Sequence, residues 1–155
     1  MIWDLSSIVG LEATSGTFTM WTKNPIGWGS YGIVLVEGKT GWEGEGGGGG
    51  NFADNWATWY WPGPGAETYW DPTYLTDVVN LGTGSADDVE CVWTFNGAGL
   101  SYINSVLGSG YLELVGVAQR DADNQFSDSC NMQFHSERSS ETEHRPVLDL
   151  TLSVP

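Results

Sequence analysis

Hydrophobic and polar residues alternate one by one along several short stretches of the chain. The clearest stretch is VLDLTLSV at 147–154, where the leucines and Val154 fall on one side of an extended segment and Asp149, Thr151 and Ser153 fall on the other. Because successive side chains of a strand point to opposite faces, this period of two predicts a strand with one solvated face. Similar β-rich runs predict six more strands, at 16–22, 31–37, 56–61, 89–95, 111–118 and 130–136.

A single segment shows helical spacing instead. In NGAGLSYINSVLGSG, Leu100, Ile103 and Leu107 recur three and four residues apart, and Gly108 follows as a candidate C-terminal cap. We expect one or two helical turns there. Seven short strands separated by Gly, Asn, Asp and Pro, with one short helix, predict an all-β fold, an antiparallel and jelly-roll-like β-sandwich.

Length and composition indicate one folded domain. The chain has 155 residues and no linker long enough to separate two domains, so we expect a single sandwich over 1–155. The run GWEGEGGGGGNFADN at 41–55 predicts a long flexible loop, because consecutive glycines lose much chain entropy in regular structure. Nine Trp, six Tyr and five Phe supply more apolar area than a disordered chain carries.

The charge balance excludes two classes of partner. Twenty acids against five bases give a formal net charge of -15, so the nucleic-acid backbone and an anionic membrane surface would both repel the chain. We expect neither as a partner. The first residues lack the basic start and apolar run of a secretory signal, and no run of about 18 apolar residues predicts membrane insertion.

The densest group of aromatic residues follows the glycine-rich loop. Flat aromatic faces pack well against the C–H faces of sugar rings, which makes five of these residues candidates for carbohydrate binding. They are Trp56, Trp59, Trp61, Tyr69 and Trp70. Alternation along 56–61 sends side chains to both faces of a strand, so core packing is the favoured alternative for any one of these tryptophans. Tyr69 and Trp70, on the loop side of a PGPG turn, are the better candidates for exposure.

Two acidic segments raise the question of a metal ion. The candidate calcium ligands are Asp121, Asp123, Asn124 and Asp128 in RDADNQFSDS, and a second acidic segment, SADDVE, contains Asp87, Asp88 and Glu90. Oxygen ligands one or two residues apart in a loop suit calcium, which accepts irregular geometry. The spacing does not match the full EF-hand pattern, and a solvated acidic turn is the interpretation we favour. A structural calcium ion is therefore a hypothesis that a melt in chelator would test.

The two cysteines and two histidines indicate no catalytic centre. Cys91 and Cys130 each lie in a strand-like run with inward-facing apolar companions, so a buried disulfide and two buried free thiols are equally good interpretations. The serine and glutamate after His135 face alternate sides of a strand and cannot pair with it as nucleophile and base. We expect the charged turn at 136–145, His144 included, to be solvated, with surface ion pairs of small value. No pair of acids is singled out by a motif, so we predict no enzyme activity.

Short motifs spread over nearly the whole chain resemble one known family. In order they are WDLSSI (3–8), GTFTMW (16–21), GWEGE (41–45), ATW (57–59), WTFNGAGLSYINSVLGSG (93–110), FHSER (134–138) and RPVLDLTL (145–152). Together they resemble the DNRLRE repeat domains, also called disaggregatase-related or alginate-type carbohydrate-binding modules. The resemblance implies a non-catalytic β-sandwich that binds carbohydrate. The chain departs from the family in reading Ser-Glu-Arg at 136–138 where the family prefers Ser-Arg-Glu.

The start of the chain is a second departure, and it suggests an alternative function. Family members usually have two or three further strands before the Asp-Leu-Ser segment, so those strands are either missing or supplied by a neighbouring subunit. The first function we expect is binding of a polysaccharide or surface glycan by an extracellular module. The alternative is a structural surface subunit, such as a virion decoration or fibre protein or a filament subunit. Such a subunit would form homo-oligomers or attach to a larger assembly, and its negative charge would keep an extracellular or virion surface soluble.

Overall fold

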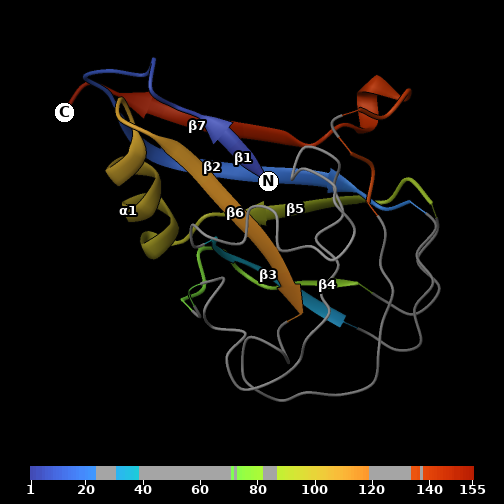
Figure 1. Ribbon diagram of the computed structural model, residues 1–155. Helices are drawn as coiled ribbons and strands as arrows, with labels where there is room; N and C mark the ends of the chain where they lie inside the picture. The colour runs from blue at the N-terminus through green and yellow to red at the C-terminus, as the bar shows by residue number, and fades with distance from the viewer. Residues whose placement is uncertain (24–30, 39–70, 72, 82–86, 119–133, 137) are drawn as a thin grey trace, which may run out of the picture.

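The strands and helices are placed by a computed structural model that describes residues 1–23, 31–38, 71, 73–81, 87–118, 134–136 and 138–155. Within these residues lie seven strands, one α-helix and a 3-10 helix (Figure 1). In chain order they are β1 (Ile2–Asp4), β2 (Glu12–Trp21), β3 (Tyr31–Glu37), β4 (Val79–Leu81), β5 (Glu90–Thr94), α1 (Gly97–Val106), β6 (Tyr111–Ala118), η3 (Thr142–His144) and β7 (Val147–Ser153).

The strands form two antiparallel sheets (Figure 1). One sheet has the strand order β1-β6-β3-β4 and the other has the order β5-β2-β7. The long strand β2 is the centre of the second sheet, since it pairs with β5 from Thr17 to Trp21 and with β7 from Glu12 to Thr19. The predicted fold class is confirmed: the protein is mostly β, with two antiparallel sheets and one short helix, consistent with a β-sandwich.

Most strand boundaries agree with the alternation of the sequence. β3 and β6 coincide with the predicted runs, and β5 and β7 agree to within one residue at either end. β2 begins at Glu12, earlier than predicted, because a register shift between Ala13 and Ser15 interrupts its alternation. The pattern does not predict β1 and β4, because three residues are too few to show a period. The predicted loop 41–55, the strand 56–61 and most of 130–136 lie outside the described residues.

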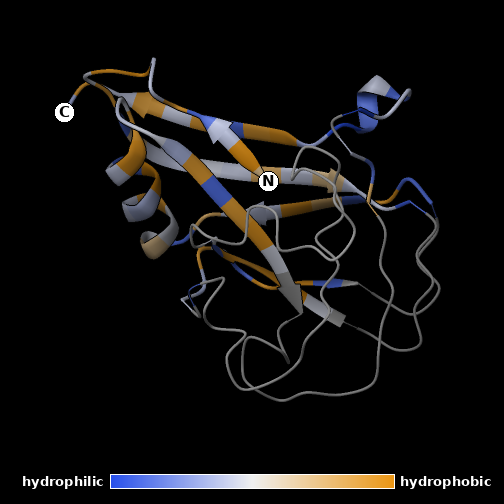
Figure 2. Ribbon diagram, viewed as in Figure 1, coloured by the Kyte–Doolittle hydropathy of each residue, from blue (hydrophilic) through white to orange (hydrophobic). Residues whose placement is uncertain are grey.

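The main core lies between the two sheets. Phe18 of β2 and Trp93 of β5 stack with ring centroids 6.0 Å apart, and Leu35 and Leu114 of the opposite sheet are buried in the same cluster. Trp93 Nε1 donates to the carbonyl oxygen of Ile33 at 2.9 Å, which joins the sheets and satisfies the indole N–H. In Figure 2, β7 alternates between hydrophobic and hydrophilic colours, in line with its alternately half-buried and exposed side chains.

The helix α1 packs against β2 and β6 at one end of the sandwich (Figure 1). Asn96 caps its first turn with a side-chain oxygen, and the predicted cap Gly108 follows its end with a φ of 73°. Ile103 is buried on the predicted apolar face, and the Asn104 side chain exchanges hydrogen bonds of 2.7 and 3.1 Å with the backbone of Ala13. The helix has ten residues and is longer than predicted, because the cap starts it one turn earlier.

No helix within the described ranges has the length and apolar character needed to cross a membrane.

Candidate functional site

Most of the candidates from the sequence lie outside the described residues. This holds for the aromatic candidates between 56 and 70 and for the calcium candidates between 121 and 128, so both sets remain predictions. Two chemically distinct features can be built from the residues that are described. One is a cluster of imidazoles and carboxylates at the end of the sandwich away from α1, and the other is a shallow hollow beside α1.

Thr22, directly after β2, positions two residues of the cluster. On one side its N–H donates to the carbonyl of Val89 at 3.0 Å, its carbonyl accepts from the N–H of Asp88 at 2.8 Å, and its hydroxyl accepts from the N–H of Val89 at 3.1 Å. On its other side Thr22 forms a β-bridge with Phe134, and the N–H of His135 donates to the carbonyl of Trp21 at 2.9 Å. The end of β2 therefore holds Asp88 and His135 as neighbours, although they are far apart in the sequence.

The turn after His135 supplies the other two residues. Side chains three positions apart in a 3-10 helix lie on the same side, and Glu141 and His144 have this spacing around η3. The N–H of His144 donates to the carbonyl of Glu141 at 3.1 Å. Arg145 braces the turn, since its Nε and Nη2 both donate to the carbonyl of Ser139, at 3.0 and 2.9 Å. The carboxylate of Glu141 and the imidazole of His144 therefore face the same way.

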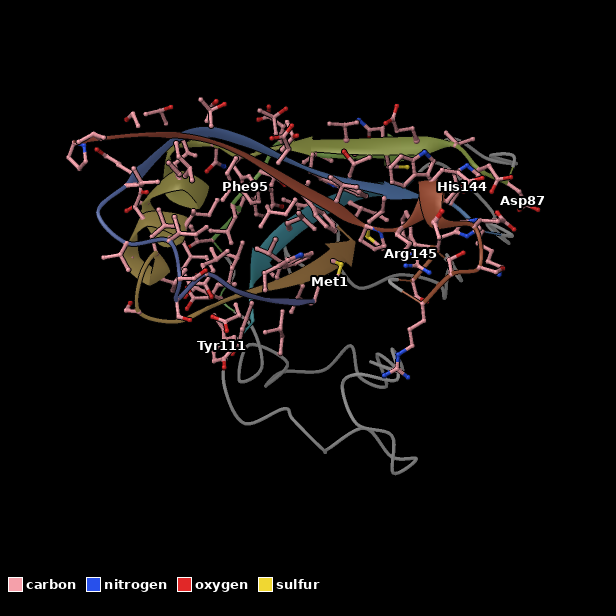
Figure 3. The ribbon with its side chains drawn as sticks, turned by 90° about the horizontal axis from the view of Figure 1, so that it is seen from above. Met1, Asp87, Phe95, Tyr111, His144 and Arg145 are labelled. Carbon is pink, nitrogen blue, oxygen red and sulfur yellow. The ribbon has the colours of Figure 1, made fainter. Side chains whose placement is uncertain are left out.

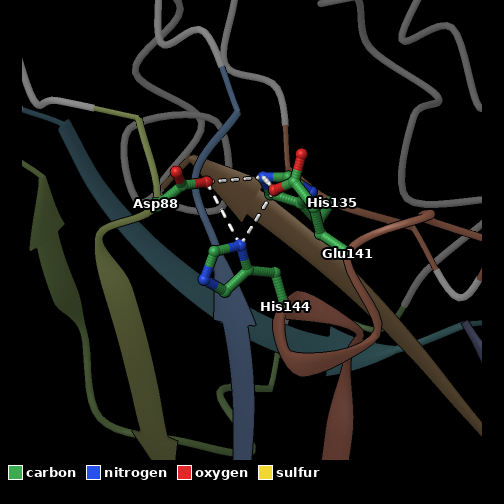
Figure 4. A group of neighbouring side chains, drawn as sticks. All are labelled: Asp88, His135, Glu141 and His144. Carbon is green, nitrogen blue, oxygen red and sulfur yellow. Dashed lines mark hydrogen bonds and ion pairs between the residues drawn. The ribbon is translucent and has the colours of Figure 1, made fainter.

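Four side chains, Asp88, His135, Glu141 and His144, meet at this end of the sandwich (Figure 4). Nε2 of His135 lies 2.9 Å from Oδ1 of Asp88 and 3.8 Å from Oε2 of Glu141. Nδ1 of His144 lies 3.3 Å from Oδ1 of Asp88 and 3.1 Å from Oε2 of Glu141. All four donor atoms lie within 4.8 Å of one another. The four-residue cluster is thus a compact set of two nitrogen and two oxygen donors.

The cluster is partly covered by other side chains. The side chain of His135 is 2% exposed and that of His144 is 22% exposed, whereas Asp88 and Glu141 are about half exposed. The ring of Trp21 lies 5.8 Å from that of His144, and the two imidazoles lie 5.1 Å apart. Figure 3 shows His144 at the end of the molecule away from α1. His144 is therefore only partly solvated, because the charged turn folds back onto the end of β2.

Asp88 adopts a backbone conformation that is unfavourable for most side chains. Its φ of 62° lies in the left-handed region, and it is the sole non-glycine residue with a positive φ within the described residues. This conformation costs on the order of 1 kcal/mol, although Asp tolerates it better than most residues. From this position its Oδ1 faces both imidazoles. Residues held in rare backbone conformations are concentrated at functional sites.

The sequence contained one signal for the four-residue cluster. The chain has two histidines, and they lie on either side of Glu141 within ten residues. Both histidines belong to the cluster. Asp88 could not be added from the sequence, because its proximity depends on the pairing of Thr22 with segments on both sides. The sequence alone therefore predicts an acidic turn around Asp88 and gives no sign that it meets the two histidines.

The second feature is a shallow hollow of about 340 Å³ beside α1. Asp71 donates its N–H to the carbonyl of Glu37 at 2.9 Å, and Leu75 donates to the carbonyl of Leu35 at 2.9 Å, which fastens this segment along β3. The N–H of Thr73 donates to Oδ1 of Asp71 at 2.8 Å. On the other side the hollow is bounded by one face of α1, whose residues recur every three or four positions. The lining residues are Glu37, Asp71, Thr73, Leu75, Ala98, Ser101, Tyr102 and Ser105.

Tyr102 is the aromatic residue of this lining, and its hydroxyl is anchored. The hydroxyl accepts from the N–H of Glu113 at 3.3 Å and donates to the carbonyl of the same residue at 3.5 Å. Burial raises the pKa of the Tyr102 phenol above its ordinary value, so the ring remains neutral at physiological pH. The hydroxyl of Ser105 donates to the Tyr102 carbonyl at 2.7 Å. The hollow therefore combines a fixed ring with carboxylates and small hydroxyl side chains.

Of the two cysteines predicted to be buried, Cys91 lies within the described residues. Cys91 is 2% exposed on the inner face of β5, and its thiol lies 3.6 Å from the carbonyl oxygen of Val89. Cys130 lies outside the described residues, so a disulfide between the two remains a prediction. Burial of Cys91 agrees with both interpretations of the sequence, which each placed it in the core.

Comparison with known proteins identifies no relative, so the class of this protein is defined by its fold. No family model, no curated protein and no solved structure matches the chain. The resemblance to DNRLRE repeat domains therefore stays a prediction. The class that the fold defines is an antiparallel β-sandwich with one short helix.

Proposed function

We propose that this chain is a non-catalytic β-sandwich module that binds carbohydrate on an extracellular or virion surface. The observation that carries the proposal is the hollow beside α1, whose lining combines two carboxylates, several hydroxyls and a tyrosine ring. Sugars present many hydroxyl groups and apolar C–H faces. Carboxylates accept strong hydrogen bonds from hydroxyls, and aromatic rings pack against the C–H faces, so this lining complements both properties of a sugar.

The position of the hollow in the sequence also supports this function. Asp71, in the lining, directly follows the aromatic candidates Tyr69 and Trp70 in the chain. A shallow, open hollow suits a few units of a polysaccharide that continues beyond the protein on both sides. Of the serines of α1, Ser101 adds a hydroxyl that can donate and accept hydrogen bonds, while Ser105, whose proton is donated to the Tyr102 carbonyl, adds an acceptor.

Charge favours neutral sugars over acidic ones. Glu37 and Asp71 lie in the hollow of a chain whose formal net charge is -15. Like charges repel, so a polyuronate would approach this surface unfavourably unless a cation bridged the two. The class of ligand that fits the lining is therefore a neutral, hydroxyl-rich polysaccharide or surface glycan.

The test is a binding titration against a panel of neutral and acidic polysaccharides, followed by calorimetry with the best ligand. Asp71→Asn removes a charged acceptor from the hollow while keeping the side-chain size. We expect it to weaken binding about tenfold, which corresponds to one hydrogen bond to a charged group. Asp77→Asn is the matched control, because Asp77 is exposed, carries the same charge and is not part of the lining. Absence of binding across the panel, or equal losses in the two variants, would contradict the proposal.

A second candidate function is a structural surface subunit that assembles with copies of itself. One observation favours it: β7 is a seven-residue strand that pairs, within the described residues, only with β2 on one side. A strand edge of this length presents backbone groups that another strand can pair with. Val147 of β7 and Val92 of β5, both paired with Thr19 of β2, are exposed on the outer face of the same sheet.

A further inference from the structure

We propose that the cluster of Asp88, His135, Glu141 and His144 is a structural zinc site that fastens together the end of the sandwich away from α1. The proposal is independent of carbohydrate binding, since the cluster and the hollow share no residue. It differs from the calcium hypothesis in ligand chemistry and in position. Two of the four donors are imidazole nitrogens, whereas calcium takes oxygen ligands almost without exception.

The spacing of the donor atoms fits a tetrahedral ion. Zinc binds imidazole nitrogen and carboxylate oxygen at about 2.0–2.2 Å, which places neighbouring ligands of a tetrahedron roughly 3.3–3.5 Å apart. The four nitrogen–oxygen distances in the cluster are 2.9, 3.8, 3.3 and 3.1 Å, which spread on both sides of that value. The remaining pairs, nitrogen to nitrogen and oxygen to oxygen, lie within 4.8 Å. Side-chain movements of up to about 1 Å, chiefly at the two half-exposed carboxylates, would bring all four donors to one ion with this tetrahedral spacing.

The surroundings of His135 orient it as a metal ligand. Its Nδ1 lies 3.1 Å from Oγ of Ser139, and that same oxygen accepts a hydrogen bond from the N–H of Glu141 at 3.2 Å. When Nδ1 carries the proton and donates it to Ser139, the lone pair of Nε2 points at the centre of the cluster. A hydrogen bond of this kind from the second nitrogen is what usually fixes a metal-bound histidine. Ser139 thereby links the orientation of His135 to the position of Glu141.

The number and type of the four ligand side chains indicate which ion the cluster binds and whether that ion is structural or catalytic. Two imidazoles with two carboxylates suit zinc, while magnesium prefers oxygen ligands and water in an octahedron. Four protein ligands fill the coordination shell of a tetrahedral ion, so no position is left for a reacting water or substrate. The ion would also neutralise the two carboxylates, whose oxygens face the same centre from opposite loops. The site is therefore structural and not catalytic.

Binding of the ion would join segments that are distant in the sequence. Asp88 precedes β5, His135 lies beside the end of β2, and Glu141 and His144 belong to the turn that leads into β7. A single ion would therefore fix three segments at one end of the sheet β5-β2-β7. The unfavourable backbone of Asp88 is consistent with this role, because the coordination bond would hold its carboxylate in place.

The first experiment measures zinc binding by the full chain. The protein is stripped with chelator, dialysed into metal-free buffer and titrated with zinc by calorimetry, with thermal melts recorded in parallel. We expect one ion per chain and a melting temperature that rises by about 5–10 °C when free zinc is 100 times its dissociation constant. Cobalt offers a second readout, because a tetrahedral Co²⁺ site gives an intense visible absorption that octahedral Co²⁺ lacks.

Two neighbouring glutamates provide a matched pair of variants. Glu141→Gln removes one ligand, whereas Glu143→Gln makes the same change of charge in the same exposed turn outside the cluster. We expect zinc affinity to fall more than roughly tenfold in the first variant, the least that loss of a supporting group near a metal costs, and to be unchanged in the second. Asp88→Asn keeps a residue that tolerates the left-handed backbone, and we expect it to weaken zinc binding as well. Both changes keep the size of a half-exposed side chain and leave the buried His135 in the chain, so both variants should fold.

The alternative is a metal-free network in which each imidazole donates to a carboxylate. In that case Glu141→Gln would lower the melting temperature in chelator, and zinc would not raise it in any variant. Three results overturn the zinc proposal: no saturable binding by the stripped chain, equal zinc affinity in Glu141→Gln and Glu143→Gln, or stabilisation by calcium as large as that by zinc. Weaker zinc binding in Glu141→Gln and Asp88→Asn, with the tetrahedral cobalt spectrum lost in both, supports it.

Discussion

Cys91 illustrates how one buried side chain links packing to pH. It lies on the inner face of β5, and burial, with a smaller contribution from Glu90, raises the pKa of its thiol from 9.0 to about 11. In the unfolded chain the thiol loses its proton near pH 9, while in the folded chain it keeps the proton until about pH 11. The thiol therefore stabilises the fold fully below pH 9, and this contribution is lost as the pH rises toward 11.

This difference predicts a measurable loss of stability in alkali. Raising the pH from 7.5 to 10 should lower the free energy of unfolding by about 1 kcal/mol, because the Cys91 thiol ionises in the unfolded chain but not in the folded one. Cys91→Val lacks the titrating group and fills similar space, and other ionisable groups are common to both proteins. Denaturant unfolding at both pH values measures how much the free energy of unfolding changes with pH in each protein. The difference between these two changes is the contribution of Cys91. Intact mass after alkylation in denaturant, without reductant, first establishes whether both thiols are free; a protein that takes up no label carries a disulfide and would not show the effect.

Single polar residues were the least predictable part of the chain. Thr22 is fully buried; alternation puts it on the same face as Phe18, but a polar residue directly after a strand gives no sign in the sequence of how completely it is covered. Its burial follows from backbone pairing with two loops, which only the three-dimensional arrangement reveals. His144 is less solvated than predicted for the same reason, because a run of charged residues does not indicate that a turn folds back on a tryptophan.

At the level of elements, α1 depends on a close approach at Gly99. The helix packs so tightly on the segment before β4 that a Cβ added at Gly99 would collide with the carbonyl oxygen of Leu75 and approach Phe95 Cδ1 to 2.9 Å. A backbone atom cannot move aside as a flexible side chain can. Gly99 therefore lets α1 close that end of the sandwich, and the Asn96 cap, which accepts from Gly99 N at 3.0 Å, holds it there.

Gly99→Ala should therefore destabilise the protein by about 1–3 kcal/mol, the usual cost of overpacking a core. Gly97→Ala is the control, because a Cβ at Gly97 meets nothing within 4 Å. That change should be neutral or stabilising by up to about 1 kcal/mol, since Ala has the higher helix propensity. Urea unfolding of the two variants and the parent protein measures both values. A loss of stability as large in Gly97→Ala as in Gly99→Ala would mean that chain flexibility, and not the contact with Leu75, sets the effect.

The elements themselves were largely predictable because each carries its own periodicity. In β7, half-buried and exposed side chains alternate over seven residues, and the Leu100, Ile103 and Leu107 spacing located α1. The pairing of elements was not predictable, since it depends on which edges meet in space. The four-residue cluster belongs to this second kind of information: its histidines are close in the sequence, but Asp88 joins them only through the order β5-β2-β7 and the bridges around Thr22.

For the whole molecule, charge and edge geometry act in opposite directions on self-association. The side of β7 that pairs with no strand among the described residues favours addition of a further strand, while a formal net charge of -15 on every copy opposes contact between copies. Salt weakens the second effect and leaves backbone hydrogen bonding nearly unchanged, because the Debye length falls from about 30 Å at 0.01 M to about 3 Å at 1 M. An assembly subunit of this composition should therefore associate more strongly as the salt concentration rises.

Sedimentation of the full chain across this range of salt tests the role as a surface subunit. If β7 forms the contact, the native mass should rise with salt in discrete steps, and Val147→Asp, at the exposed start of β7, should return the protein to a monomer. Ser153→Asp adds the same charge to an exposed position at the far end of the same strand, and it should weaken assembly less. A monomer at every salt concentration would exclude self-assembly through this edge and would leave the hollow beside α1 as the functional surface. Equal effects of the two substitutions would show that added charge, and not loss of an apolar contact, controls association.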